Sequence, residues 1–118
     1  MAITLTGTGI TFPVGGTQEK AASGFVLGYG QIWYNVTSSR ALLTTYTNNT
    51  GRPIQVFIRM AGSTSNALVF RVDGVDISTT AHNGGGASTA CVSCIVPTGS
   101  TYSISNASYP LGNWFELR

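Results

Sequence analysis

The segment CVSCIVPTGSTYSIS, from Cys91 to Ser105, contains residue types at a spacing that could support metal or redox chemistry. Two cysteines separated by two residues form half of a zinc site or, at the start of a helix, a thiol–disulfide centre. This segment is typical of a strand, in which positions i and i+3 face opposite ways and lie about 10 Å apart, whereas a disulfide needs Cα atoms within about 7 Å. We therefore interpret Cys91 and Cys94 as free thiols that pack as small apolar residues, and we expect no metal and no cofactor.

The other groups that could act in catalysis are few. The chain has one histidine, His82, and its carboxylates are Glu19, Asp73, Asp76 and Glu116. A Ser–His–Asp triad needs a positioned acid and a nucleophile, and a glycosidase needs two facing carboxyl groups. His82 lies in a run typical of a loop, and Asp73 and Asp76 flank a turn in which Asp serves backbone geometry. We assign no catalytic residue and expect that the protein is not an enzyme.

Aromatic side chains offer a different chemistry, because an exposed ring can stack on a sugar. The candidates are Trp33, Tyr34, Tyr109, Trp114 and Phe115. Adjacent residues on a strand face opposite ways, so one ring of each adjacent pair should lie in the core and the other should point outward. We expect most of these rings in the core or at a subunit interface.

The elements that must position these groups are strands. Apolar residues alternate with other residues along 54–60 and along 68–72, which is the period of a strand with one buried face. Further strands are expected at 31–36 and 113–117. Turn residues separate these runs at Asn48 to Pro53, at Asp73-Gly74 and at Pro97 to Ser100, and each of these turns predicts a hairpin.

Short strands at this spacing predict an all-β domain, an antiparallel β-sandwich or jelly-roll-like fold, over residues 31–118. Residues 1–30 are rich in Gly and Thr and lack sustained alternation. They predict an extended N-terminal segment, either a stalk or an edge strand. The length of 118 residues fits one such domain.

The charge content limits the possible partners. Only 8% of the residues are charged and the net charge is +2, against a usual charged share of about 25%. The surface must be covered by Ser, Thr, Asn and Gly, and part of it is expected to be hidden in an assembly. The scattered basic residues argue against a nucleic-acid partner. The lack of an apolar run of roughly 20 residues argues against membrane insertion, and the N-terminus lacks the features of a secretion signal.

One long motif runs from Gly30 to Ile58: GQIWYNVTSSRALLTTYTNNTGRPIQVFI. It contains G-Q-x-W-x-N-V-T, then S-R, then T-Y-x-N-x-T-G-[KR]-P-I. The later runs VPTGSTYSIS and NWFELR follow in the same order. Together these motifs, which cover about Gly30 to Arg118, resemble those of C-terminal domains of bacteriophage and prophage tail fibres.

The resemblance implies a β-sandwich at the tip of a fibre, assembled as a homotrimer, which binds a host surface receptor such as a polysaccharide. It also implies contacts with other tail fibre or baseplate parts, and a place in the virion after assembly in the bacterial host cytoplasm. The motif residues carry over as scaffold and not as a receptor site: Gln31, Trp33, Asn35, Arg40, Tyr46, Asn48, Gly51 and Pro53.

Two other functions stay open. The chain could be a purely structural virion component, either a fibre trimerisation cap or a baseplate adaptor, which would not bind host cells. It could also be an enzyme that degrades surface polysaccharide, although the shortage of carboxylates disfavours this function.

The receptor site is expected on loops, where recognition residues commonly lie. The candidate residues are His82 and Asn83, whose side chains can hydrogen-bond hydroxyl groups, and Tyr109, whose ring could stack on a sugar. If these residues do not bind the receptor, the next candidate is a flank of the sandwich that carries Arg59 and Arg71.

Overall fold

The structure is a computed structural model of the 118-residue chain. It describes residues 26–62, 67–81, 88–105 and 110–118, together with the short segments 4–6, 9–11 and 17–18. In those three short segments, and at residues 61, 62, 67, 81 and 88, the description is limited to the backbone.

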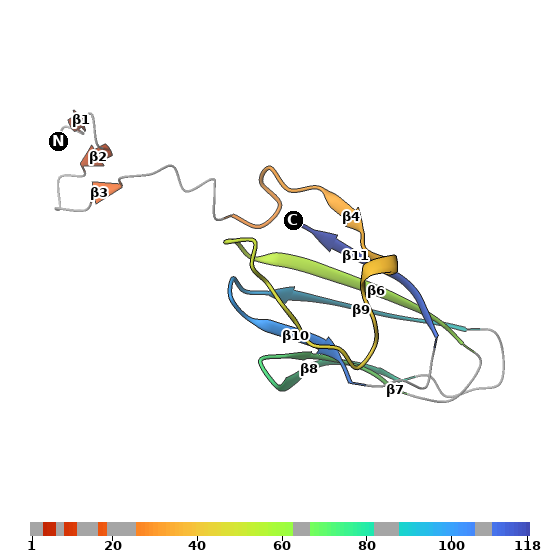
Figure 1. Ribbon diagram of the computed structural model, residues 1–118. Coiled ribbons are helices and arrows are strands. Elements are labelled where there is room, and N and C mark those ends of the chain that lie inside the picture. Colours follow the sequence, from red (N-terminus) through yellow and green to blue (C-terminus); the bar gives the residue numbers. More distant parts are fainter. Residues whose placement is uncertain are drawn as a thin grey trace.

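Two antiparallel sheets of four strands each pack face to face, so the expected all-β sandwich is confirmed (Figure 1). The first sheet has the order β4-β11-β6-β9 and the second has the order β5-β10-β7-β8. The strands are β4 (Trp33–Asn35), β5 (Tyr46–Thr47), β6 (Ile54–Gly62), β7 (Ala67–Val72), β8 (Val75–Ala81), β9 (Ser88–Val96), β10 (Thr101–Ile104) and β11 (Leu111–Leu117).

The chain alternates between the two sheets in a jelly-roll arrangement. Strand β4 lies in the first sheet, β5 in the second and β6 in the first; the β7–β8 hairpin lies in the second, and β9, β10 and β11 alternate again. As a result β4 and β11, the first and last strands of the sandwich, are paired neighbours. This pairing brings the Gly30–Ile58 motif beside the C-terminal run NWFELR.

The core lies between the sheets and is built from the alternating strands. Every second residue of β6 from Ile54 to Met60 is buried, and so is every second residue of β7 from Leu68 to Val72. Trp114, on β11, is fully buried among them. Burying a large apolar side chain contributes about 1.5–3 kcal/mol, so these alternating runs supply most of the stabilising burial, as the sequence pattern predicts.

One predicted hairpin is confirmed and two are wrong. Strands β7 and β8 pair across Asp73 and Gly74, whose φ angles of 49° and 79° are both positive, as a two-residue type I′ turn requires. Strand β5 pairs with β10 and not with β6, and β9 pairs with β6 and not with β10. The turns at 48–53 and 97–100 therefore carry the chain from one sheet to the other.

The cysteines lie on β9 and are free, on opposite sides of the strand, as expected. Cys91 is exposed and pairs in register with Arg59, whereas Cys94 is half-buried, pairs with Val56 and packs against the core. Burial raises the pKa of the Cys94 thiol, and this effect outweighs the hydrogen bond to the Ile95 carbonyl. Cys94 thus behaves as the small apolar residue that the sequence predicts, whereas Cys91 is exposed and does not pack in this way.

The N-terminal segment contains β1 (Thr4–Thr6), β2 (Gly9–Thr11) and β3 (Thr17–Gln18), which pair antiparallel in a sheet of their own. Whether residues 1–30 act as a stalk stays a prediction. Between β4 and β5 the chain forms a single turn of 3-10 helix, η2 (Thr37–Ser39). No helix in the described part of the chain is long and apolar enough to span a bilayer.

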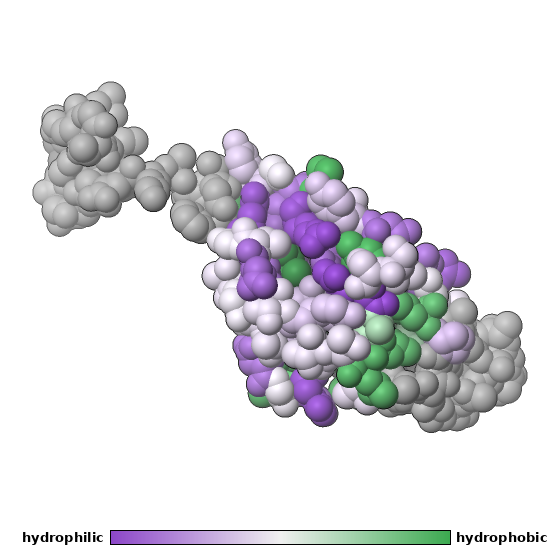
Figure 2. Space-filling model, in the orientation of Figure 1, coloured by the Kyte–Doolittle hydropathy of each residue, from purple (hydrophilic) through white to green (hydrophobic). Residues whose placement is uncertain are grey.

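The surface agrees with the low charge of the sequence. Figure 2 shows one side of the sandwich, on which white and pale purple residues cover most of the area and green hydrophobic residues gather in a few patches. Residues of intermediate hydropathy thus predominate on this side, in agreement with a charged share of only 8%.

Candidate functional site

A buried carboxylate, Glu116 on β11, forms the centre of the main polar cluster. Along β11, Trp114 and Glu116 face inward while Phe115 faces outward, because successive residues of a strand alternate. The Glu116 side chain is only 1% exposed. An isolated charge at such a depth would cost several kcal/mol, so it must be paired and hydrogen-bonded.

Three groups surround this carboxylate. The Arg40 guanidinium donates two hydrogen bonds, from Nε to Oε1 at 2.9 Å and from Nη2 to Oε2 at 3.0 Å. The Tyr102 hydroxyl donates to Oε1 at 2.8 Å. Arg118 Nη1 lies 3.4 Å from Oε2. Because Tyr102 comes from β10 in the second sheet, its hydrogen bond to Glu116 on β11 connects the two sheets.

The environment shifts the acidity of two of these groups. Burial, and then the hydrogen bond to Glu116, raise the pKa of Tyr102 to about 12. Burial alone would lower the pKa of Arg40, but the hydrogen bonds and charge of Glu116 raise it above its usual value. The tyrosine is therefore neutral and the arginine charged throughout the physiological range, and the cluster is a fixed structural unit.

The turn after β5 is also fixed by side-chain hydrogen bonds, here from Asn48. Asn48 is buried, and its Nδ2 donates to the carbonyl oxygens of Arg52 at 2.8 Å and Val96 at 3.0 Å. Its Oδ1 accepts the Thr50 backbone N–H at 3.1 Å, which closes an Asx turn. Gly51, at φ 79°, occupies the left-handed position that this turn needs.

A cavity of about 320 Å³ lies between the Glu116 cluster and this turn. It is lined by Arg40, Thr47, Asn48, Asn49, Thr50, Ile54, Tyr102, Glu116 and Arg118. Thr47, Asn49, Thr50 and Arg118 are exposed to solvent, while the groups behind them are buried and hydrogen-bonded. The cavity thus presents hydroxyl, amide and guanidinium groups on a rigid base.

The chemistry of this cavity suits binding. Amide and hydroxyl side chains both donate and accept hydrogen bonds, and arginine donates, so together they match the hydroxyl groups of a sugar. Among the described residues, Glu116 is the only carboxylate that lines the cavity, and hydrolysis of a glycosidic bond commonly needs two. In the part of the chain that the structure describes, no three His, Cys, Asp or Glu side chains gather as metal ligands.

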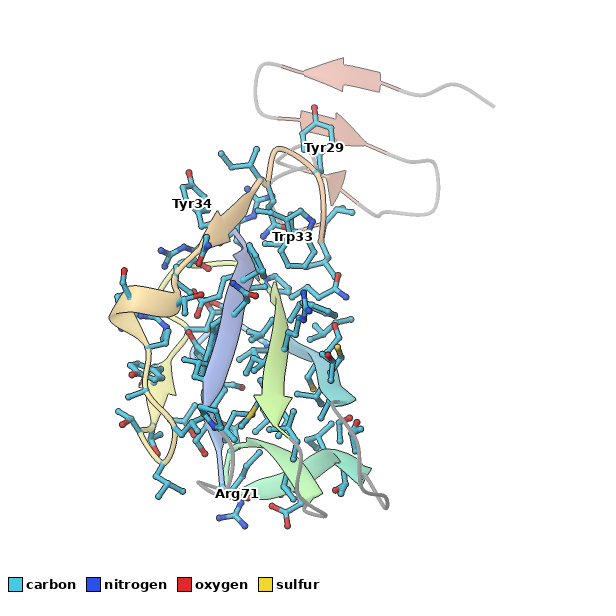
Figure 3. The ribbon with its side chains drawn as sticks, turned by 90° about the vertical axis from the view of Figure 1, so that its right-hand side faces the viewer. Tyr29, Trp33, Tyr34 and Arg71 are labelled. Atoms are coloured by element: carbon cyan, nitrogen blue, oxygen red, sulfur yellow. The ribbon has the colours of Figure 1, made fainter. Side chains whose placement is uncertain are left out.

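Of the residues expected to bind the receptor, the main candidates are not described by the structure, and the two arginines of the second hypothesis do not lie together. His82, Asn83 and Tyr109 lie outside the described residues, so their role stays a prediction. The proposed flank with Arg59 and Arg71 is wrong. Arg59 lies on β6 in the first sheet and Arg71, labelled in Figure 3, lies on β7 in the second, so they occupy different sheets of the sandwich.

The motif residues mostly hold the scaffold, as the resemblance implies. Gln31 is buried and donates from Nε2 to the Pro53 carbonyl at 2.9 Å. Asn35 Oδ1 accepts the Thr37 backbone N–H at 3.1 Å, at the start of η2. The Tyr46 hydroxyl accepts a backbone N–H, and the Arg40 guanidinium lies 4.5 Å from the centre of the Tyr46 ring.

Trp33 is the exception among the motif residues, because it contributes to a surface. Its side chain is 49% exposed, and Figure 3 shows Trp33 and Tyr34 on opposite sides of β4. Tyr34 is also exposed, so the expectation that one of this pair is in the core is wrong. The reason is that β4 is an edge strand of only three residues. For Trp114 and Phe115 the expected division into core and outward ring is confirmed.

Together with Phe57, Ile95, Phe115 and Leu117, Trp33 forms a surface that we call the aromatic face. In register, Trp33, Leu117, Gln55 and Ile95 form one row across the first sheet, and Phe115 and Phe57 belong to the next row. A shallow hollow of about 380 Å³ lies among Trp33, Gln55, Phe57 and Phe115.

Sequence reasoning missed the cavity and named Glu116 only as an isolated carboxylate. One available signal was its position between Phe115 and Leu117 on a strand, where a lone acid facing the core requires a buried cation. The comparisons add no candidate residues: no protein-family model matches the chain, and neither the curated proteins nor the solved structures searched contain a match.

Proposed function

We propose that the chain is the tip domain of a bacteriophage tail fibre, that it assembles as a homotrimer in the virion, and that it binds a host surface polysaccharide without cleaving it. The observation that carries the binding function is the rigid polar cavity between the Glu116 cluster and the Asn48 turn. The tail-fibre assignment is supported by the sequence motifs from Gly30 to Arg118.

The construction of the cavity favours a ligand rich in hydroxyl groups. Thr47 and Asn49 are exposed at its mouth, where they can reach a ligand, while Arg40 and Tyr102 are held by Glu116 at fixed positions behind them. Binding sites whose groups are held in place lose little entropy when a ligand arrives. A single weak sugar site also gains avidity when several copies bind one polysaccharide.

The fold adds an analogy. Jelly-roll domains occur in viral proteins and lectins, although a fold alone does not specify a function. A surface of uncharged hydroxyl and amide groups, as in this chain, is compatible with sugar recognition and argues against partners that are recognised by charge.

The test measures polysaccharide binding by the full chain. We would probe an array of bacterial O-antigen and capsular polysaccharides, and then test the best-bound polysaccharide against Asn49→Ala and Thr47→Ala. We expect at least a tenfold loss of affinity in Asn49→Ala and a smaller loss in Thr47→Ala. Thr79→Ala, which removes another exposed strand hydroxyl from the second sheet, is the matched control and should bind normally.

Each outcome decides between sites or functions. Normal binding by both cavity variants, with loss in His82→Ala, Asn83→Ala or Tyr109→Ala, would reject the cavity and place the receptor site on the residues expected from the sequence. Failure to bind any polysaccharide or host cell would reject the receptor function and favour the structural alternative, a trimerisation cap or baseplate adaptor. Release of free sugar would show an enzyme.

A further inference from the structure

The aromatic face has an unusual composition for the outside of a β-sandwich. The outer face of an antiparallel sheet is normally polar when it meets water. Here Trp33 is 49% exposed and Ile95 is 54% exposed, at the two edges of the first sheet. Phe57, Phe115 and Leu117 are half-buried between them. Apolar side chains therefore run across all four strands of this sheet.

Charge is scarce on this face. Of the described acidic residues, Asp73, Asp76 and Glu116, none points outward from the first sheet: Glu116 faces the core, and the other two belong to the β7–β8 hairpin. Arg59 lies at one end, in the row beyond Phe57. The core of a protein–protein interface is depleted of charge and rich in aromatic residues, and the aromatic face has this composition.

The size of the face argues for a protein as its occupant. Four strands about 4.8 Å apart, with two rows of outward side chains about 7 Å apart, give an area of roughly 270 Å². Each partner buries about 800 Å² in an interface of standard size, so this face matches the apolar core of one interface. One sugar ring stacked on Trp33 would leave most of the face exposed to water.

We infer that the aromatic face is the surface through which copies of this chain pack against one another. A second copy is the partner that is always present at equal concentration, and cyclic symmetry lets one face be buried in every subunit. The inference rests on the proposed assembly of the chain into an oligomer and not on the proposed receptor: it holds equally for a purely structural fibre component.

The chain offers a closely matched pair of variants. Ile95, on the aromatic face, is 54% exposed, and Ile77, on the β7–β8 hairpin of the second sheet, is 55% exposed. We would replace each by lysine in the full chain and measure the mass by light scattering at micromolar concentration. We expect about three times 12.3 kDa for the unaltered chain and for Ile77→Lys, and up to a threefold lower mass for Ile95→Lys.

Tryptophan fluorescence supplies a second reading that does not depend on one variant. The chain has two tryptophans, of which Trp114 is fully buried within the subunit and Trp33 is half exposed. If copies pack through the aromatic face, acrylamide should quench little fluorescence in the oligomer. In Ile95→Lys the quenching should rise, because Trp33 becomes accessible. If Ile95→Lys does not fold, Trp33→Lys on the edge strand β4 replaces it in the mass measurement.

The inference is overturned by a monomer, by an oligomer in which Trp33 stays fully accessible to acrylamide, or by an Ile95→Lys variant that folds and keeps the full mass. A monomer whose Trp33 is protected by bound polysaccharide would make the face a glycan surface, which also overturns it. An oligomer that behaves as expected but binds no polysaccharide would leave this inference standing and reject the receptor function.

Discussion

The two outer faces of the sandwich differ in chemistry although the same chain builds both. On the first sheet, the outer residues form the aromatic face. On the second sheet, the register places Arg71, Asp76, Thr79, Thr101 and Ser103 outward, with Val69 among them, and we call this surface the polar face. The polar face is mostly what an antiparallel sheet in water normally shows, although Val75 and Ile77 on β8 are also exposed. This contrast is the observation from which we infer that copies of the chain pack through the first sheet and not through the second.

The sequence pattern carries part of this difference, although β7 of the second sheet also has three successive apolar residues, Leu68 to Phe70. Strand β10, TYSI, alternates strictly between polar and apolar residues. Strand β11 contains Trp114 and Phe115 side by side, and β6 places Phe57 between two core residues. Apolar residues at successive positions of a strand mean that both of its faces are apolar, which is the pattern of a sheet covered on both sides.

The two outer faces exist only while the two sheets stay packed together. The largest effect on stability is therefore expected from replacing Glu116, whose hydrogen bonds connect the sheets. Replacing Glu116 by Ala leaves the half-buried Arg40 without its carboxylate and removes the acceptor for the Tyr102 hydroxyl. Breaking a buried ion pair by removing one partner costs about 3–5 kcal/mol. We expect Glu116→Ala to lower the free energy of unfolding by this amount in urea denaturation. A loss below about 1 kcal/mol would mean that water already reaches the cluster.

The second prediction concerns the same tie between the sheets at high pH. Tyr102 has its pKa raised from 10.0 to about 12. A group with a raised folded-state pKa contributes stability that is complete below its unfolded pKa, here pH 10.0, and that is lost as the pH rises to about 12. A shift of about two units corresponds to at most about 3 kcal/mol.

We therefore expect the unfolding free energy of the unaltered chain to fall more steeply above pH 10 than that of Tyr102→Phe, whose ring cannot ionise. At neutral pH, Tyr102→Phe should itself be less stable by about 1 kcal/mol, because it loses the hydrogen bond to Glu116. Tyr34→Phe, which removes the hydroxyl of an exposed tyrosine on the edge strand β4, is the control and should keep the steep fall. Parallel curves for Tyr102→Phe and the unaltered chain would contradict the prediction.

The third prediction uses β9, whose two cysteines lie on opposite sides of one strand. Cys94 packs against the core and Cys91 is exposed on the outer side. Cys94→Ala should cost about 1 kcal/mol, because it leaves a small cavity, and Cys91→Ala should stay within about 0.5 kcal/mol. Both variants should keep the mass of the oligomer. An equal cost for the two substitutions, measured by thermal unfolding, would contradict the assignment of the two sides of β9.

How far the sequence predicted this molecule depends on how local each signal is. The buried alternation from Ile54 to Met60 and the hairpin at Asp73-Gly74 follow from neighbouring residues, and both were predicted correctly. The turn at Asn48 to Pro53 has the same local chemistry whether its flanking strands pair or cross between sheets, so its hairpin was predicted wrongly.

The candidate site depended on pairings that are distant along the chain. Arg40 and Glu116 are 76 positions apart, and no periodicity indicates that they meet. The cavity is a consequence of that meeting and of the Asn48 turn. Trp33 was assigned to the scaffold through the resemblance alone. Tyr34 occupies the inner position of β4, in register with Glu116, and is exposed because β4 lies at the edge of its sheet.

The smallest effect is expected for a substitution on the polar face. It tests the comparison of the two faces at the face where little should change. Arg71 Nε and Asp76 Oδ1 lie 2.7 Å apart, but both side chains are largely exposed. Exposed ion pairs contribute little to stability, because water and salt screen them and both side chains must be ordered. Asp76→Asn should therefore shift the melting temperature less than Cys94→Ala does and leave the mass of the oligomer unchanged. If Asp76→Asn instead dissociated the oligomer while Ile95→Lys did not, the polar face would be the subunit contact, and the roles assigned to the two faces would be reversed.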